Sequence, residues 1–196
     1  MLDDEKVLAD RHLEWINRFT SIETGIYVNG ELIQFQETML FNNELGVSIP
    51  SAFRDMTPEM AKKKYFSEQR PEVIKTNEDG SVNLCFNMID KSVKEDQLEA
   101  VIHEFYRVLK RFQPMSVCLD TGSEPKEETP SAWMEFISSA LNENIYNVLT
   151  VYPAGERLLM IMFNCPFEKR NSWSNCLSLI RKSVVLYGDK KKMEIG

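Results

Sequence analysis

The sequence predicts an α+β fold in which helices cover a mainly antiparallel sheet, and three observations support this. About seven to nine strand-like segments are joined mostly by short turns, and helical segments come at intervals rather than after every strand, which favours antiparallel pairing. Residues Leu158 to Phe163 are apolar throughout, which is typical of a central strand covered on both faces. Amphipathic helices predicted at about 92–113 and 172–185 can supply that cover.

The N-terminal residues predict an amphipathic helix at about residues 4 to 19. Its apolar face consists of Leu8, His12, Trp15, Ile16 and Phe19. A hairpin follows, because Asn29-Gly30 is a dipeptide that tolerates two positive φ angles between short strands. We therefore expect an N-terminal extension over residues 1–37, a main domain over 38–187 and a polar C-terminal tail over 188–196.

The main domain begins with a predicted strand pair in TMLFNNELGVSIP, residues 38–50, followed by a short helix to about Lys64. Thr57 can cap this helix, and Pro58 suits its first turn because the proline φ is already helical. The lysines at 62–64 fall in the last turn, where cations interact favourably with the helix dipole.

Residues 76–88, TNEDGSVNLCFNM, surround a glycine with acidic and amide side chains, as a calcium-binding loop can. When Gly80 takes the sixth position of an EF-hand loop, however, Lys75 falls at the first position and Phe86 at the twelfth. Both positions require oxygen ligands, so we expect a β-hairpin instead of a metal site. The predicted turn is Glu78, Asp79 and Gly80, and the apolar face of the second strand is Val82, Leu84, Phe86 and Met88.

A long helix is predicted after this hairpin, with Ser92 and Glu95 as a capping box and Pro114 beyond its end. Its apolar stripe is Leu98, Val101, Ile102, Phe105, Leu109 and Phe112. Four strands follow, namely MSVCLDTG, SAWMEFISS, IYNVLTVY and RLLMIMFNC. In the last helix, at about 172–185, the inner face consists of Trp173, Cys176, Leu177, Ile180 and Val184.

Composition and charge weigh against several classes of partner. The formal net charge is -7, which repels nucleic-acid phosphates and anionic lipid headgroups. The acidic N-terminal residues do not match a signal peptide, and no apolar run is long enough to span a membrane. We therefore expect a cytoplasmic protein, unless an export signal preceded these residues. The four cysteines, Cys85, Cys118, Cys165 and Cys176, have no zinc-ligand spacing and are predicted to be buried thiols.

Two segments resemble a known superfamily. The first, residues 40–88, contains a strand pair ending in Ile-Pro, a short helix and a hairpin, and reads LFNNELGVSIPSAFRDMTPEMAKKKYFSEQRPEVIKTNEDGSVNLCFNM. The second, residues 145–184, contains a strand that leads through FNCP to a terminal helix with a tryptophan, and reads IYNVLTVYPAGERLLMIMFNCPFEKRNSWSNCLSLIRKSV. Over about residues 38–187 the chain is similar to the PsbP-like superfamily, which includes photosystem extrinsic subunits, the Ran-GTPase release factor and bacterial DcrB-type proteins. The resemblance implies an α/β/α sandwich and a non-catalytic binding or accessory role.

Residues that could support catalysis are few. His12 and His103 are the two imidazoles, and each is interpreted as a polar residue beside an apolar stripe rather than as a base. No Walker A, G-x-S-x-G or G-x-G-x-x-G motif is present. The carboxylates of Glu124, Glu127 and Glu128 lie in a predicted polar loop and are interpreted as a solvated surface, with a cation site as the alternative.

We therefore expect a non-catalytic protein whose partner is another protein, and no cofactor or metal. Aromatic side chains dominate protein interfaces, so the candidate contact residues are Trp15, Phe19 and Trp133. Trp173 is assigned to the core. Self-association through the N-terminal extension is a further mode of contact that the sequence allows. The alternative function is a small-ligand carrier or a weak thiol-dependent hydrolase.

Overall fold

The computed structural model describes residues 20–65, 70–124, 129–140 and 143–187. The predicted N-terminal helix, with His12, Trp15 and Phe19, lies outside the described residues, as do Glu127, Glu128 and the C-terminal tail. A seven-stranded sheet with the order β5-β6-β7-β11-β10-β9-β8 forms the centre, and each neighbouring pair is antiparallel. The predicted α+β class with a mainly antiparallel sheet is confirmed.

The central strands are β5 (Arg54–Asp55), β6 (Val73–Thr76), β7 (Asn83–Ile89), β8 (Val117–Glu124), β9 (Ser131–Ser139), β10 (Asn144–Ala154) and β11 (Arg157–Pro166). There are two smaller sheets. β1 (Ile26–Val28) with β2 (Glu31–Ile33) is the hairpin predicted in the N-terminal extension, and β12 (Val185–Leu186) with β4 (Leu45–Pro50) and β3 (Phe35–Leu40) is a sheet that the sequence did not separate from the central one. The helices are α2 (Pro58–Lys64), α3 (Leu98–Phe112) and α4 (Arg170–Lys182), with 3₁₀ turns η2 (Glu95–Gln97) and η3 (Phe167–Lys169).

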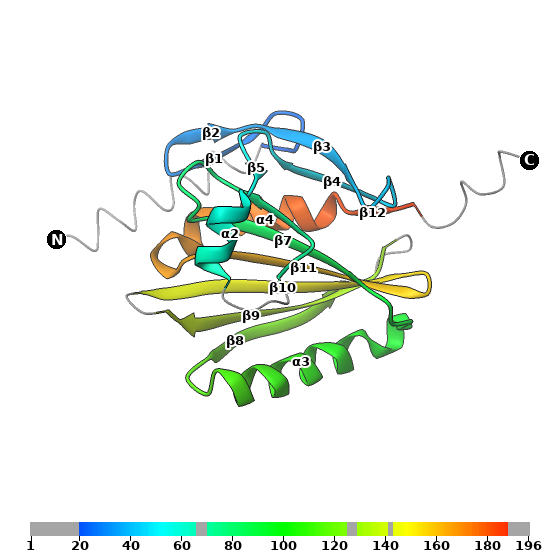
Figure 1. Ribbon diagram of the computed structural model, residues 1–196. Coiled ribbons are helices and arrows are strands. Elements are labelled where there is room, and N and C mark those ends of the chain that lie inside the picture. Colours follow the sequence, from blue (N-terminus) through cyan, green and yellow to red (C-terminus); the bar gives the residue numbers. More distant parts are fainter. Residues whose placement is uncertain (1–19, 66–69, 125–128, 141–142, 188–196) are drawn as a thin grey trace, which may run out of the picture.

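Helices cover both faces of the central sheet (Figure 1). On one face α4 packs together with the small sheets, and Trp173 is buried there between Phe53 and Phe163, as predicted. On the other face α3 packs over β9 and β10, and α2 packs over β6 and β7; partly buried Met162 contacts both of these clusters. Apolar side chains on both faces of β11 explain why its sequence is apolar without alternation.

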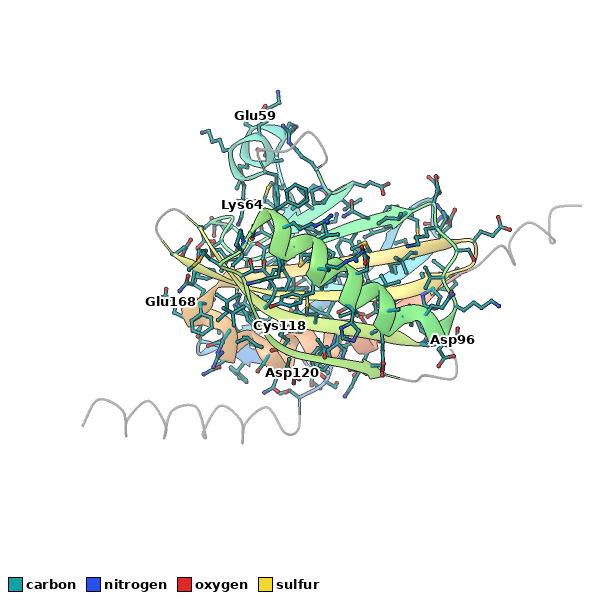
Figure 2. The ribbon with its side chains drawn as sticks, turned by 90° about the horizontal axis from the view of Figure 1, so that it is seen from below. Glu59, Lys64, Asp96, Cys118, Asp120 and Glu168 are labelled. Carbon is teal, nitrogen blue, oxygen red and sulfur yellow. The ribbon has the colours of Figure 1, made fainter. Side chains whose placement is uncertain are left out.

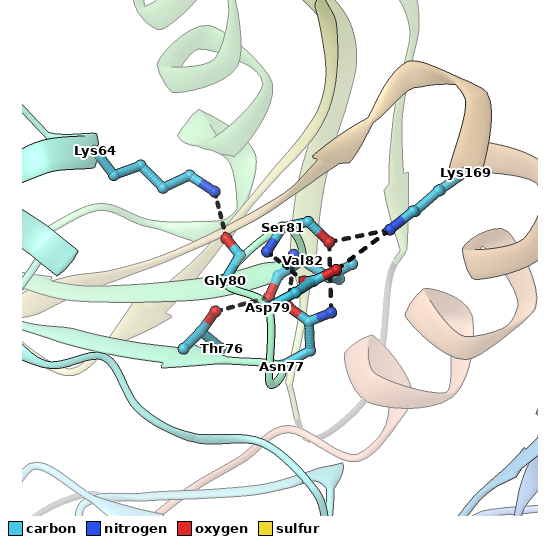
Figure 3. Close-up of polar contacts among 8 residues, drawn as sticks. All are labelled: Lys64, Thr76, Asn77, Asp79, Gly80, Ser81, Val82 and Lys169. Carbon is cyan, nitrogen blue, oxygen red and sulfur yellow. Dashed lines mark hydrogen bonds and ion pairs between the residues drawn. The ribbon is translucent and has the colours of Figure 1, made fainter.

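The hairpins follow the turn residues that predicted them. Asn29 and Gly30 have φ angles of 51° and 82° between β1 and β2. Residues 77–82 reverse the chain between β6 and β7, where Gly80 has a φ of 75°. The Asp79 carboxylate accepts the Ser81 N–H at 2.8 Å and pairs with Lys169 at 3.8 Å (Figure 3). These carboxylate oxygens therefore stabilise the predicted turn.

Three details of the predicted helices are wrong. Ser92 and Glu95 do not form a capping box: η2 comes first, and the Gln97 side chain accepts the Lys94 N–H at 3.0 Å. Val93 is buried beneath α3, and its burial sets where this turn begins. Phe112 was assigned to the core stripe but is exposed. The last helix ends at Lys182 rather than at residue 185.

Candidate protein-binding surface

Helix α3 buries the first part of its apolar stripe and exposes the last part. Leu98 and Ile102 are 2% and 3% exposed against the sheet, whereas Phe112, the last residue of the stripe, is 81% exposed and Val108, outside the stripe, is 40% exposed. The chain reverses directly after Phe112 and enters β8, which is the outermost strand of the central sheet. No described strand lies beyond β8, so the aromatic ring at the end of α3 has no layer to pack into.

The connection between α3 and β8 is held by side-chain and backbone hydrogen bonds. The Lys110 ammonium donates to the carbonyl oxygen of Pro114 and, at 2.9 Å, to that of Ser116. Ser116 is buried, and its N–H donates to the Gln113 carbonyl at 3.0 Å. Met115 lies inside this hydrogen-bonded turn yet is 78% exposed. The exposed ring and thioether are therefore presented by an ordered turn rather than by a frayed end.

Edge strand β8 continues the exposed apolar area. Val117 and Leu119 are 53% and 39% exposed, and a register irregularity interrupts the pairing with β9 between Cys118 and Asp120. The opposite edge of the sheet, β5, has only two residues, so among the described strands β8 is the long free edge of the central sheet. We call the following residues the edge surface: Val108, Phe112, Met115, Val117 and Leu119.

The far end of β8 is acidic. Two cavities of about 320 and 160 Å³ lie between β8 and the start of α3, and both are lined by Glu99 and Ser123. The Ser123 hydroxyl donates to the Glu99 carboxylate at 2.9 Å. The carboxylates around the two cavities are those of Glu95, Asp96, Glu99 and Glu124, and no Lys or Arg is among the described lining residues. Figure 2 shows Asp96 at one end of α3, and Cys118 and Asp120 on β8.

This acidic end is not arranged as a metal centre in the described part of the chain, which holds no group of three or more His, Cys, Asp or Glu residues able to bind an ion. Glu124 was placed in a polar loop by the sequence, but it is the last residue of β8 and pairs with Arg181 at 3.1 Å. His103 is exposed and lines the smaller cavity. Within the described residues it makes no hydrogen bond to a thiol or hydroxyl.

Trp133, a predicted contact residue, lies on the sheet face opposite α3. Its ring packs over Gly122, where an added Cβ atom would come within 2.7 Å of the ring, and the Arg181 guanidinium lies 4.9 Å from the ring centroid. The side chain is partly exposed. A contact role for Trp133 stays a prediction, and its packing between Gly122 and Arg181 gives it a structural role as well.

A buried polar cluster lies beneath α2. The Tyr65 hydroxyl is 3.1 Å from the Cys85 thiol, and the side-chain amides of Asn83 and Asn164 lie 2.8 Å apart. Lys64 is an exposed residue, but its ammonium extends to this turn and donates to the Gly80 carbonyl at 2.8 Å (Figure 3). Desolvation of the ammonium lowers the pKa of Lys64. The cluster attaches α2 to the β6–β7 turn.

The four cysteines are free thiols, and burial is the main cause that raises the pKa of each. The pKa is raised to about 11 for Cys85 and to about 12 for Cys165 and Cys176. Cys118 is partly exposed, which differs from the predicted burial. Because the thiolate is the nucleophilic form, raised pKa values weigh against the thiol-dependent hydrolase.

The sequence missed Phe112 and Met115 as surface residues. Helical periodicity predicted that Phe112 would be buried in the core. An apolar stripe shows which residues share one face of a helix, but it does not show how far the layer facing them extends. A signal was present in the neighbouring residues: Lys110 and Arg111 precede Phe112, and Pro114 follows it. An apolar pair inside a cationic, proline-containing connection is a pattern that indicates an exposed turn.

Neither a protein-family model nor a curated protein sequence matches the chain. Solved structures do match. The solution structure of CyanoP, the cyanobacterial PsbP of Synechocystis sp. PCC 6803, is 8% identical, covers 83% of this chain and 98% of its own, and has a TM-score of 0.62. This chain has a PsbP-like fold. The fold that the resemblance in the sequence implied is thereby confirmed over most of the chain.

Two further solved structures share the PsbP-like fold. The Ran-binding protein Mog1p of Saccharomyces cerevisiae is 11% identical, covers 80% of this chain and 97% of its own, and has a TM-score of 0.52. LpqN of Mycobacterium tuberculosis, which is involved in cell envelope biogenesis, is 8% identical, covers 82% of this chain and 94% of its own, and has a TM-score of 0.51. These identities show a common fold and do not transfer a partner.

Proposed function

We propose that this PsbP-like protein is a non-catalytic binding or accessory protein that contacts another protein through the edge surface. The observation that carries the proposal is the exposure of Phe112 and Met115, at 81% and 78%, in a turn that hydrogen bonds hold in place. Mog1p is described as a Ran-binding protein, so the fold can serve protein binding.

The energetics of the edge surface suit an interface. Fully burying a Phe or Met side chain is worth about 1.5–3 kcal/mol each, and aromatic residues and Met are enriched in interfaces. Val117 and Leu119 extend the apolar area along β8. The exposed cation Arg111 directly precedes Phe112 on α3, which adds a polar group of the kind found in the rim of interfaces.

The larger cavity is the one feature that favours the alternative, a small-ligand carrier, and its carboxylates predict a cationic ligand. A rise in Tm with an amine such as spermidine would support that alternative. A cytoplasmic location and self-association through residues 1–37 stay predictions. Among the described residues, no helix is both long and apolar enough to cross a membrane.

Site-specific photo-crosslinking in the native cell tests the proposal. A benzoylphenylalanine residue replaces Met115 in one variant and Leu32 in a matched control, because Leu32 is an exposed apolar residue on β2, in a different sheet. We expect one discrete adduct with a different protein from position 115 and none from position 32. Adding Phe112→Asp to the position 115 variant should remove the adduct.

Three outcomes would contradict the proposal: no adduct from position 115, the same adducts from positions 115 and 32, or an adduct with a second copy of this chain only. An adduct that survives Phe112→Asp would show that the edge surface is not what the partner recognises. Far-UV circular dichroism of each variant confirms that the fold is retained, so that a lost adduct reports on contact.

A further inference from the structure

Resting on the proposed function, we infer the class of partner: an extended polypeptide segment that adds to β8 as an antiparallel strand, with Lys or Arg in its first half and apolar residues in its second half. The inference combines the free edge of β8, the exposed apolar residues at its start and the acidic cavities at its end.

Among the described strands β8 pairs with β9 alone, so most backbone groups along its other side are available to a partner strand. Two groups near its middle are already used: the Thr121 N–H donates to the Asp120 carboxylate at 2.8 Å, and the Asp120 carbonyl accepts from the Cys118 thiol at 3.8 Å. Its eight residues extend over roughly 25 Å at about 3.3 Å per residue, which is sufficient for strand addition. Strand β3 is a second edge, in the small sheet, but Met39 is its exposed large apolar residue. β8 is thus the edge with the larger apolar area beside it.

The polarity of β8 changes along its length. Val117 and Leu119 lie at its start, shortly after Phe112 and Met115 in the chain, whereas Glu124, which pairs with Arg181, ends the strand beside the cavity lined by Glu95 and Glu99. A segment lying along this edge therefore meets apolar side chains at one end and carboxylates at the other. Charge complementarity assigns Lys or Arg to the second end.

The direction of the added strand follows from the sheet. All pairs in the central sheet are antiparallel, and parallel pairing is slightly less stable per residue. In an antiparallel addition the N-terminal half of the partner lies beside Glu124 and its C-terminal half beside Val117. The basic residues therefore come first in the partner and the apolar residues second.

A second copy of β8 fits this edge less well. If two β8 strands paired antiparallel about their centres, the apolar start of each would face the acidic end of the other. Val117 would then lie near Glu124 of the other copy, and neither charge nor apolar area would be matched. These features select a partner of opposite polarity.

Selection from a random library of displayed peptides, about 12 residues long, tests the inference on the full chain. We expect enriched peptides with Lys or Arg followed by apolar, β-branched or aromatic residues. Synthetic versions should bind with a Kd that rises as salt is added. Peptides with the two halves exchanged should bind more weakly.

Two double variants assign the acidic end. Glu95→Lys with Asp96→Lys reverses two exposed charges beside the larger cavity. The matched control reverses Glu59 and Glu168, two exposed acids that line neither cavity. We expect the first pair to weaken binding about tenfold, as complementary rim charges do, and the control pair to change it less than about twofold.

Enriched peptides without basic residues would overturn the inference, as would a loss of peptide binding in the Glu95→Lys, Asp96→Lys variant no larger than in the control pair. Either result would leave the proposed function standing, because the apolar contact needs neither the basic residues of the peptide nor these carboxylates. No enrichment at all would overturn strand addition, and crosslinking from position 115 would still decide the proposed function. Binding that is unchanged by Met115→Asp would overturn the placement on β8.

Discussion

Replacing Phe112 by Ala separates a side chain that maintains the fold from one that is displayed on it. The matched substitution is Phe136→Ala, because Phe136 is only 3% exposed in the cluster beneath α3, whereas Phe112 is 81% exposed at the end of the same helix. The atoms removed are identical. The free energy of unfolding should therefore respond to the difference in burial.

The magnitude follows from the exposed fractions. A buried aromatic side chain covers about 200 Å², and Phe112 keeps about a fifth of its surface covered, or roughly 40 Å². At about 25 cal/mol per Å² the loss is about 1 kcal/mol, and the better helix propensity of Ala restores up to about 0.5 kcal/mol. The net cost for Phe112→Ala should stay below about 1 kcal/mol, while Phe136→Ala should cost about 3–5 kcal/mol.

Urea unfolding followed by far-UV circular dichroism measures both variants. We expect the Phe112→Ala midpoint to stay close to that of the unchanged chain and the Phe136→Ala midpoint to fall steeply, with similar m-values. A loss above about 2 kcal/mol for Phe112→Ala would refute the reasoning, because another part of the chain would then have to cover the ring.

Three further predictions concern the thiols, the sheet face opposite α3 and the buried amides. Iodoacetamide at pH 8 should modify Cys118 first, because the other three thiols are buried. The pKa of about 11 for Cys85 leaves only about a thousandth of that thiol ionised at pH 8. Equal rates of modification would contradict this prediction. The protected thiols are Cys85, Cys165 and Cys176. Gly122→Val should cost about 1–3 kcal/mol and alter the near-UV circular dichroism, since its Cβ would meet the Trp133 ring at 2.7 Å; an unchanged spectrum would be inconsistent with that packing. Asn164→Leu should cost about 1–3 kcal/mol in thermal or urea unfolding because Asn83, 2.8 Å away, loses a partner; a neutral result would show that Asn83 needs no such partner.

Local residue patterns predicted most of the fold. Asn29-Gly30 and Asp79-Gly80 predicted two hairpins because few residue types adopt the positive φ angles that Asn29, Gly30 and Gly80 have. Thr57 and Pro58 predicted the start of α2, and the Thr57 side chain indeed accepts the Met60 N–H at 3.3 Å. These signals act over a few residues, so the sequence alone contains them.

Features that depend on where one layer ends could not be predicted in the same way. Phe112 continues the stripe of α3, but whether it is buried depends on β8 being the outermost strand, which is a property of the whole sheet. The hydrogen bond from the Lys64 ammonium to the Gly80 carbonyl also depends on the β6–β7 hairpin, which lies outside the helix that contains Lys64. The candidate surface was missed because the periodicity of α3 predicts a buried Phe112, whereas the sheet ends at β8 and leaves Phe112 exposed.

Hydrogen exchange of the backbone amides, with and without a selected peptide, tests most directly whether the edge surface is where partners bind. We expect slower exchange in β8, at residues 117–124, and in the turn at 113–116, with no change in β5 at the opposite edge or in β3 of the small sheet. Slower exchange in β5 or β3 with β8 unchanged would contradict this expectation.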